Sequence, residues 1–299
     1  MRRCTGFWAA EPSDPAGPSE LMMELDAATL DDARDAWRAG DRRDLDEAVF
    51  STATLGACLE AACWAAATND KELHLLLDRW ATLFPPISAA LLALTTDMVL
   101  PRASDHDAPA FELRRCPSRA ELVDAGVGVE WRYFLDRFRR SLGSRLGVSA
   151  SRAHGLAASL HEMVDNVVDH AGLGDAPTGV VAYEVSDGRF AFAVADLGRG
   201  VLASLHENPA NSGLSTHSDA LLGAVTRGAS RRLGVGGKGF ADLLRALADL
   251  DGHLSFRTGS ARLFLDGRGV GNRKFIPSNS PDMKGFQLSV VGRPGKSSW

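Results

Sequence analysis

The chain has 299 residues, of which 45% are hydrophobic and 24% are charged, and its formal net charge is −5. This length allows two domains, and the apolar share is ordinary for a globular protein. The negative charge argues against a protein that grips nucleic acid over its whole surface, although a local basic patch stays compatible with it. No apolar run reaches the ~18 residues of a membrane span, so we expect no membrane anchor.

The N-terminus and the cysteines indicate a reducing compartment. The first residues lead into a stretch that contains Pro and Glu, without the sustained apolar core of a secretory signal. The four cysteines, at positions 4, 58, 63 and 116, are spaced neither as a zinc site nor as a disulfide framework. We therefore expect a cytoplasmic protein with free thiols.

Residues 1–109 predict a mainly helical accessory domain that ends in a linker. Three segments rich in Ala and Leu have the pattern of helices: residues 30–37, 55–67 and 71–83. The Pro-, Asp- and Ala-containing stretch at 101–109 indicates the linker. An amphipathic helix at 130–146 then leads into a second predicted domain, residues 110–299.

A helix with one chemical face follows in the second domain. Glu162, Asn166 and His170 recur every four residues, while Leu, Met and Val residues between them form an apolar stripe. A carboxylate one helical turn from a carboxamide can position a nucleophile while the amide oxygen holds a hard cation such as Mg²⁺. A solvated polar face is the alternative for this segment alone.

A buried strand at residues 189–195 is predicted to end at an aspartate beside two glycines. Asp196 can accept a hydrogen bond from an exocyclic amine. Gly198 and Gly200 permit positive φ and the close approach of a flat ring. In isolation, a turn after a strand explains the motif.

A glycine-rich loop precedes a predicted helix at residues 240–248. Its glycines are Gly234, Gly236, Gly237 and Gly239. Free backbone amides at a helix start attract phosphate, and Lys238 offers a point charge for a terminal phosphate. The spacing fits neither a Walker loop nor a Rossmann turn. A flexible loop that faces solvent is the alternative.

In order and spacing, these three elements resemble the N box and the two glycine boxes of the histidine kinase-like ATPase superfamily, which includes sensor kinases, anti-sigma serine kinases and gyrase. The resemblance covers residues 131–291. It implies an α+β fold of the Bergerat type, which is a two-layer sandwich of a mixed, largely antiparallel sheet with helices on one face. The mainly helical domain of residues 1–109 would precede it.

The resemblance also implies roles for the motif residues. Glu162 would be the catalytic base, Asn166 the Mg²⁺ ligand and Asp196 the group that binds the adenine amine. Gly198 and Gly200 would shape the adenine pocket. The phosphates would meet the glycine-rich loop: Gly234, Gly236, Gly237, Lys238 and Gly239. The implied cofactors are ATP and Mg²⁺.

Between the glycine boxes, residues 201–236 resemble the ATP lid of the family, and its arginines could approach phosphates: Arg227, Arg231 and Arg232. Downstream, residues 252–259 and 261–265 predict a hairpin, and residues 285–291 predict the last strand. Gly285 and its neighbours depart from the family, because many members carry Gly-Thr there. Thr258 is a candidate for the missing hydroxyl in the cofactor site, and a place on the strand surface is the alternative.

The chain stops soon after the closing strand, so its layout resembles stand-alone bacterial anti-sigma-type serine kinases rather than gyrase. In the kinase hypothesis, Glu162 accepts a proton from a Ser or Thr of a partner protein. One alternative is an ATP-dependent switch or slow ATPase that controls a partner without phosphorylating it. Another is an enzyme that uses the pocket for a different purine. His74 lacks the signature of a phosphoacceptor histidine, and the sequence leaves a homodimer open.

Overall fold

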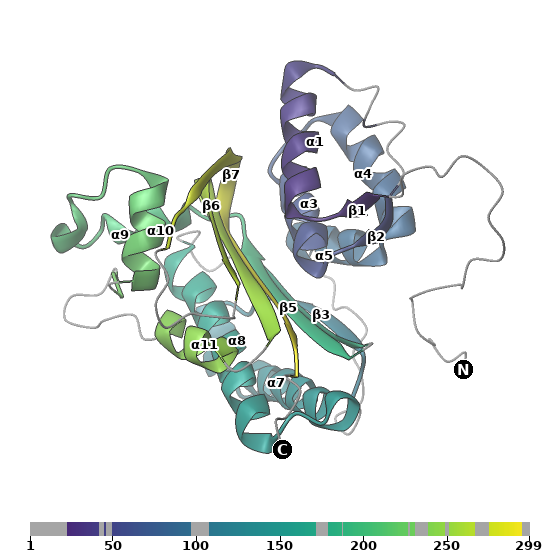
Figure 1. The fold of residues 1–299 in the computed structure, drawn as a ribbon, viewed down its shortest axis with the longest axis vertical. Coiled ribbons are helices and arrows are strands. Elements are labelled where there is room, and N and C mark those ends of the chain that lie inside the picture. Colours follow the sequence, from purple (N-terminus) through teal and green to yellow (C-terminus); the bar gives the residue numbers. More distant parts are fainter. Residues whose placement is uncertain are drawn as a thin grey trace.

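The computed structural model describes residues 23–41, 45, 50–96, 108–171, 179–186, 188–226, 228–230, 239–248, 251–266 and 275–294. These residues form a mixed α+β structure around a five-stranded antiparallel sheet of order β3-β4-β5-β7-β6 (Figure 1). The strands are β3 (Phe111–Arg115), β4 (Gly179–Ser186), β5 (Arg189–Asp196), β6 (Asp251–Asp266) and β7 (Ser278–Arg293). The predicted antiparallel sheet is thus confirmed. None of the described helices combines the length and the apolar character that crossing a membrane requires.

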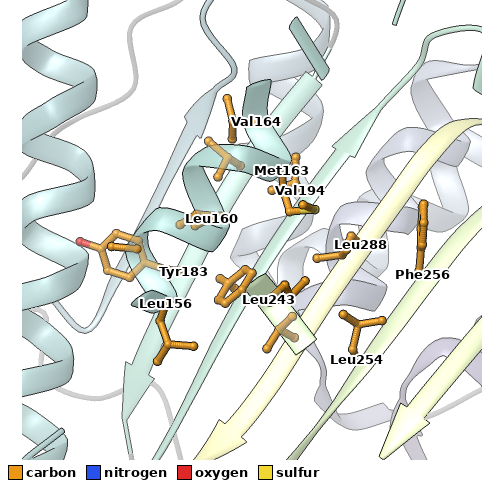
Figure 2. Packing of buried hydrophobic residues seen from close by; sticks show 14 of the residues in the cluster. Leu156, Leu160, Met163, Val164, Tyr183, Val194, Leu243, Leu254, Phe256 and Leu288 are labelled. Carbon is orange, nitrogen blue, oxygen red and sulfur yellow. The ribbon is translucent and has the colours of Figure 1, made fainter. Parts of the chain in front are cut away.

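One face of the sheet carries large apolar side chains and is covered by three helices. They are α7 (Ala125–Leu146), α8 (Ala150–His170) and α11 (Gly239–Ala248). The apolar stripe predicted for α8 faces the sheet, where Leu160 and Met163 pack near Val194 and Leu288 (Figure 2). The described connections add further short helices: α6 (Arg119–Val123), α9 (Gly200–Leu205), the 3-10 helix η1 (Pro209–Asn211) and α10 (His217–Thr226).

The opposite face of the sheet carries small side chains and is covered by α3 (Leu55–Ala66) and α5 (Pro85–Thr95). Alanines of β4 and β5 pack there against Leu59 of α3. The Gln287 side chain of β7 donates a hydrogen bond of 2.9 Å to the Gly56 carbonyl, which ties α3 to the sheet. Helices therefore lie on both faces: those of the N-terminal region, α3 and α5, cover this face, while α7, α8 and α11 cover the other.

The other N-terminal elements surround a second apolar core. They are β1 (Met23–Leu25), α1 (Ala27–Ala39), β2 (Phe50–Ala53) and α4 (Lys71–Leu83), and β1 pairs with β2 in parallel. The helices predicted at 30–37, 55–67 and 71–83 are confirmed as α1, α3 and α4. The two short strands and α5 were not predicted. The predicted linker at 101–109 lies mostly outside the described residues, so the division into two domains stays a prediction.

Strand β6 folds back on itself at Gly259. The extended backbone is continuous over β6, but the rings of His253 and Phe264 lie only 5.2 Å apart. Eleven extended residues would span about 36 Å. The left-handed φ of 52° at Gly259 and the register shifts on both sides of it mark the bend. The hairpin that the sequence predicted is therefore present, and we call residues 257–262 the β6 tip.

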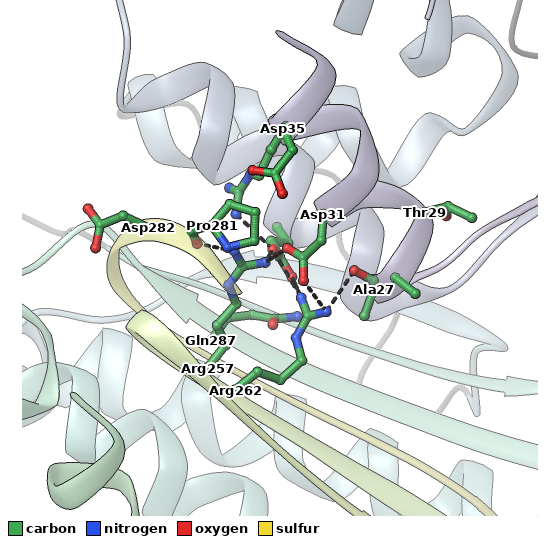
Figure 3. Close-up of polar contacts among 12 residues, drawn as sticks. Ala27, Thr29, Asp31, Asp35, Arg257, Arg262, Pro281, Asp282 and Gln287 are labelled. Carbon is green, nitrogen blue, oxygen red and sulfur yellow. Dashed lines mark hydrogen bonds and ion pairs between the residues drawn. The ribbon is translucent and has the colours of Figure 1, made fainter. Parts of the chain in front are cut away.

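Five buried or largely buried charged side chains join the N-terminal helices to the β6 tip. Figure 3 labels Asp31, Arg257 and Arg262 among them. This charge cluster consists of Asp31 and Arg34 of α1, Glu60 of α3, and Arg257 and Arg262 of β6. Asp31 is 2.6 Å from each β6 arginine, and Glu60 contacts all three arginines. Three cations thus share two carboxylates in the interior.

The arginines of the charge cluster stay charged at neutral pH. Burial lowers the pKa of Arg34 to about 10 and that of Arg257 to about 9, while nearby Asp31 acts in the opposite direction. Both values lie well above 7. The cluster is therefore a set of true ion pairs, and removing one partner leaves a buried charge uncompensated.

We predict that Glu60→Gln and Arg34→Met destabilise the fold unequally. Glu60→Gln leaves three arginines around one carboxylate, so the free energy of unfolding should fall by about 3–5 kcal/mol. Arg34→Met leaves two cations and two anions with a side chain of similar length, so its loss should be clearly smaller. Urea denaturation of both variants measures the difference. An equal or larger loss in Arg34→Met would contradict this account of the cluster.

Candidate functional site

The end of β5 places the Asp196 carboxylate in the interior. The residue is 2% exposed, and its Oδ1 accepts a hydrogen bond of 2.6 Å from the Gly198 amide. The backbone amide of Phe286 in β7 also donates to this carboxylate. Burial raises the pKa of Asp196 to about 7, and the two amide donors offset only part of that effect. A buried acceptor of this kind suits a ligand that brings its own N–H group.

Two glycines with left-handed backbone allow close packing beside Asp196. Gly285 has a φ of 76°, and a Cβ there would collide with the Asp196 carbonyl. Gly200 has a φ of 79°, and a Cβ there would lie 2.9 Å from the Thr258 hydroxyl. Protein packing therefore requires glycine at both positions. The contact of Gly200 with an adenine ring stays a prediction.

Gly198 lies where the turn after β5 meets the end of α8. A Cβ on Gly198 would lie 2.5 Å from the Ala171 carbonyl, and the next amide, that of Arg199, donates to the same carbonyl at 3.1 Å. The first glycine box is thus held against the last turn of the helix that contains the N box. The turn that carries Gly198 thus lies against the C-terminal end of the helix that carries Glu162 and Asn166.

Thr258 is buried at the β6 tip and does not lie on the strand surface. Its hydroxyl donates to the Gly285 carbonyl at 2.9 Å and accepts from the Val201 amide at 3.1 Å. It therefore connects β6, β7 and the start of α9 around Asp196. The surface position that we considered as the alternative was wrong, because an alternating strand pattern does not show which face a folded-back hairpin buries.

The N-box residues lie on the part of α8 nearest to the Asp196 end of the sheet. Val167 packs directly over Gly179, which pairs with Asp196 across β4 and β5. Glu162 is exposed, and Asn166 is half-buried. Among the described residues, the Asn166 side chain makes one hydrogen bond, from Nδ2 to the Met163 sulfur at 3.9 Å. Its amide oxygen is therefore available to a ligand.

The second glycine box is described only where it enters α11. Gly239 is the first residue of this helix, which packs against α8, and the Phe240 ring stacks on Phe256 of β6 with centroids 4.8 Å apart. The helix after the loop thus lies beside the N-box helix. The rest of the predicted phosphate site lies outside the described residues: Gly234, Gly236, Gly237, Lys238, Arg227, Arg231 and Arg232.

The predicted lid, residues 201–236, contains helical elements that contact the β6 tip. His217, at the start of α10, accepts a hydrogen bond of 2.9 Å from the Ser260 amide through Nδ1, and its ring lies against Gly259. The sequence offered no signal for this contact, because neither residue belongs to a recognisable motif. His74 is half-buried in α4, and its Nε2 bonds the Thr68 carbonyl at 3.1 Å.

Comparison with protein-family models finds none that matches this chain, and comparison with curated proteins finds no matching relative. In the part of the chain that the structure describes, no three His, Cys, Asp or Glu side chains gather as a metal site. The described cysteines, Cys58, Cys63 and Cys116, are buried free thiols, and burial raises the pKa of each. The candidate site is therefore described from the arrangement of its own residues.

We predict a pH dependence of stability that originates at Asp196. Its pKa in the folded state, about 7, exceeds the ordinary value of 3.8, so between these values the folded protein holds a proton that the unfolded chain has lost. Raising the pH through this window should therefore lower the free energy of unfolding, by about 1.4 kcal/mol per pH unit at most.

Denaturant unfolding at a series of pH values tests this expectation. Asp196→Asn should remove that part of the pH dependence, whereas Asp35→Asn on the surface of α1 should preserve it. If Asp196→Asn and the wild type show the same slope between pH 4 and pH 7, the buried carboxylate is not the group that titrates.

Proposed function

We propose that this protein binds Mg-ATP in a Bergerat-type site at the Asp196 end of the sheet and uses it to regulate a partner protein. The proposal rests on the resemblance of the three motifs to the histidine kinase-like ATPase superfamily. The observation that carries it is the burial of Asp196 where the turn after β5 meets the end of α8, because this joins the first two motifs around one hydrogen-bond acceptor.

The residues present fit an adenine nucleotide. The Asp196 carboxylate has backbone amides as its described donors, so it can accept from the exocyclic amine of adenine. The available amide oxygen of Asn166 is a ligand that Mg²⁺ prefers. Bound Mg²⁺ would neutralise phosphate charge, and the remaining ligands would come from the phosphates and water.

The enzymatic form of the proposal is a serine or threonine protein kinase of the anti-sigma type. Glu162 is exposed one helical turn before Asn166, so a partner's hydroxyl can reach it. There the carboxylate would accept the hydroxyl proton as the oxygen bonds to the γ-phosphorus, the bond from that phosphorus to the β–γ bridging oxygen breaks, and ADP leaves. The glycine-rich loop with Gly234, Gly236, Gly237, Lys238 and Gly239 would hold the phosphates.

A second candidate is a switch that binds ATP and reorganises a surface without phosphorylating its partner. The contact of the lid helices with the β6 tip favours it, because movement of the lid would change the contacts of the tip. Incubation with γ-labelled ATP and candidate partners separates the two. Label on a partner supports the kinase, and free phosphate or unchanged ATP supports the switch.

We predict distinct losses for three substitutions in calorimetric titrations with Mg-ATP. Asn166→Ala should abolish binding of Mg-ATP, and Asp196→Ala should weaken every adenine nucleotide. Glu162→Ala should bind normally and lose turnover. In the wild type, affinity should fall as the pH drops below about 7, because protonation removes the negative charge of Asp196 and turns one of its two acceptor oxygens into a donor.

Arg139→Ala serves as the control, since this side chain lies on the surface of α7 and its ion pair among the described residues is a local one with Asp136. Equal nucleotide affinity in the wild type and Asp196→Ala would contradict the assignment of the adenine site. Absence of binding heat for any adenine nucleotide in the folded wild type would overturn the proposed function as a whole.

A further inference from the structure

The β6 tip, residues 257–262, is in contact with two regions that are far apart in the chain. On one side lie the N-terminal helices α1 and α3, and on the other lie the Asp196 site and the lid helices α9 and α10. Arg257 and Arg262 of the tip contact the N-terminal helices, whereas Thr258 and Ser260 bind α9 and α10. The same short segment thus contacts both the N-terminal helices and the Asp196 site with its lid helices.

The N-terminal side holds the tip by charge. Asp31 of α1 bridges Arg257 and Arg262 at 2.6 Å each, and Arg262 also donates to the Ala27 carbonyl at 2.7 Å (Figure 3). Arg257 is fully buried and contacts Glu60 of α3. Because buried ion pairs are costly to separate, α1 and the tip should move together.

The other side of the tip reaches the Asp196 site and the lid. Thr258 follows Arg257 directly, and its hydroxyl binds the Val201 amide of α9 and the Gly285 carbonyl beside Asp196. Ser260 binds His217 of α10. The His217 ring occupies the space that a side chain on residue 259 would fill. The lid helices α9 and α10 are thus in contact with the tip in this structure.

We propose that the N-terminal helices regulate the nucleotide site through the β6 tip, with Arg257 and Arg262 as positioning residues. With α1 docked, the charge cluster fixes the tip and thereby favours the docked lid and the position of Thr258. A partner that draws α1 away frees the tip and the lid. This inference rests on the proposed nucleotide site, but the mechanical link between α1 and the lid does not require a nucleotide.

Such a link is reciprocal by thermodynamic necessity. If docking of α1 stabilises the docked lid, then docking of the lid must stabilise α1 to the same extent. A nucleotide that stabilises the docked lid would also stabilise the docking of α1 on the β6 tip. The two directions can be tested separately, since each region has a side chain that can be removed alone.

The first test is hydrogen exchange on the full chain without nucleotide. Asp31→Asn removes a charge from the cluster, and Asp35→Asn makes the same change one turn later on α1, where Asp35 is 69% exposed and pairs with Arg38 at 4.0 Å. We expect amides of α9 and α10 to exchange about 5-fold faster or more in Asp31→Asn. They should be unchanged in Asp35→Asn.

Amides of α8 serve as the internal reference, because this helix makes no described hydrogen bond to the tip. Faster exchange in α1 alone, with α9 and α10 as in the wild type, would overturn the coupling. So would an equal rise in α8, α9 and α10, since this would mean a general loss of stability.

The reverse test uses His217→Ala, which removes the lid contact at a half-buried position and should fold even if Asp31→Asn does not. We expect faster exchange in α1, although this helix is on the opposite side of the tip. Unchanged exchange of the α1 amides would refute the proposal.

A third measurement compares Mg-ATP affinity, which should be about 5-fold weaker or more in Asp31→Asn than in Asp35→Asn.

The measurements distinguish two kinds of failure. A wild-type protein that binds no nucleotide but shows coupled exchange between α1 and the lid refutes the proposed function and preserves the link. If the wild type binds Mg-ATP and the Asp31→Asn and Asp35→Asn variants bind it with equal affinity, the proposed regulation is refuted.

Discussion

The structure depends on the alternation of side-chain size along β5. Residues 190–196 are all buried, and the larger side chains, Phe190, Phe192 and Val194, meet α7 and α8 on one face. The alanines between them leave the other face shallow, so a helix must approach closely to exclude water. Helix α3, rich in Ala and buried on nearly every side, meets that requirement. A strand buried on both faces needs a covering layer on each, and here helices form both layers.

Asp196 is the last residue of β5, so it lies at the edge of this buried region. Because layers of protein lie above and below, the carboxylate is shielded from water and holds its proton to about pH 7. The same layers bring the end of α8 against the turn after β5. Packing of the sheet thus creates both the electrostatic character of the candidate site and the meeting of its motifs.

The sequence predicts the parts of this fold whose signals are local. The apolar stripe of α8, the strand before Asp196 and the helix after the glycine-rich loop depend on periodicity, and all three are confirmed. The cover of the second face is not local, because alanines in β5 do not indicate which helices pack on them. The charge cluster has no local signal either, because Asp31 and Glu60 look like ordinary polar residues in the sequence. Only the fold brings them against Arg257 and Arg262. Thr258 was misplaced for the same reason: its burial depends on α9 and β7.

The distance along the chain between the two halves of the charge cluster has a consequence for biosynthesis. A ribosome adds about 5–20 residues per second, so the 197 positions between Glu60 and Arg257 take roughly 10–40 s to complete. During that interval the nascent chain has Glu60 of α3 with Arg34 as its partner in the charge cluster, because Arg257 and Arg262 have not yet been made. A holdase chaperone that shields this helix would have most to do while the middle of the protein is still being translated.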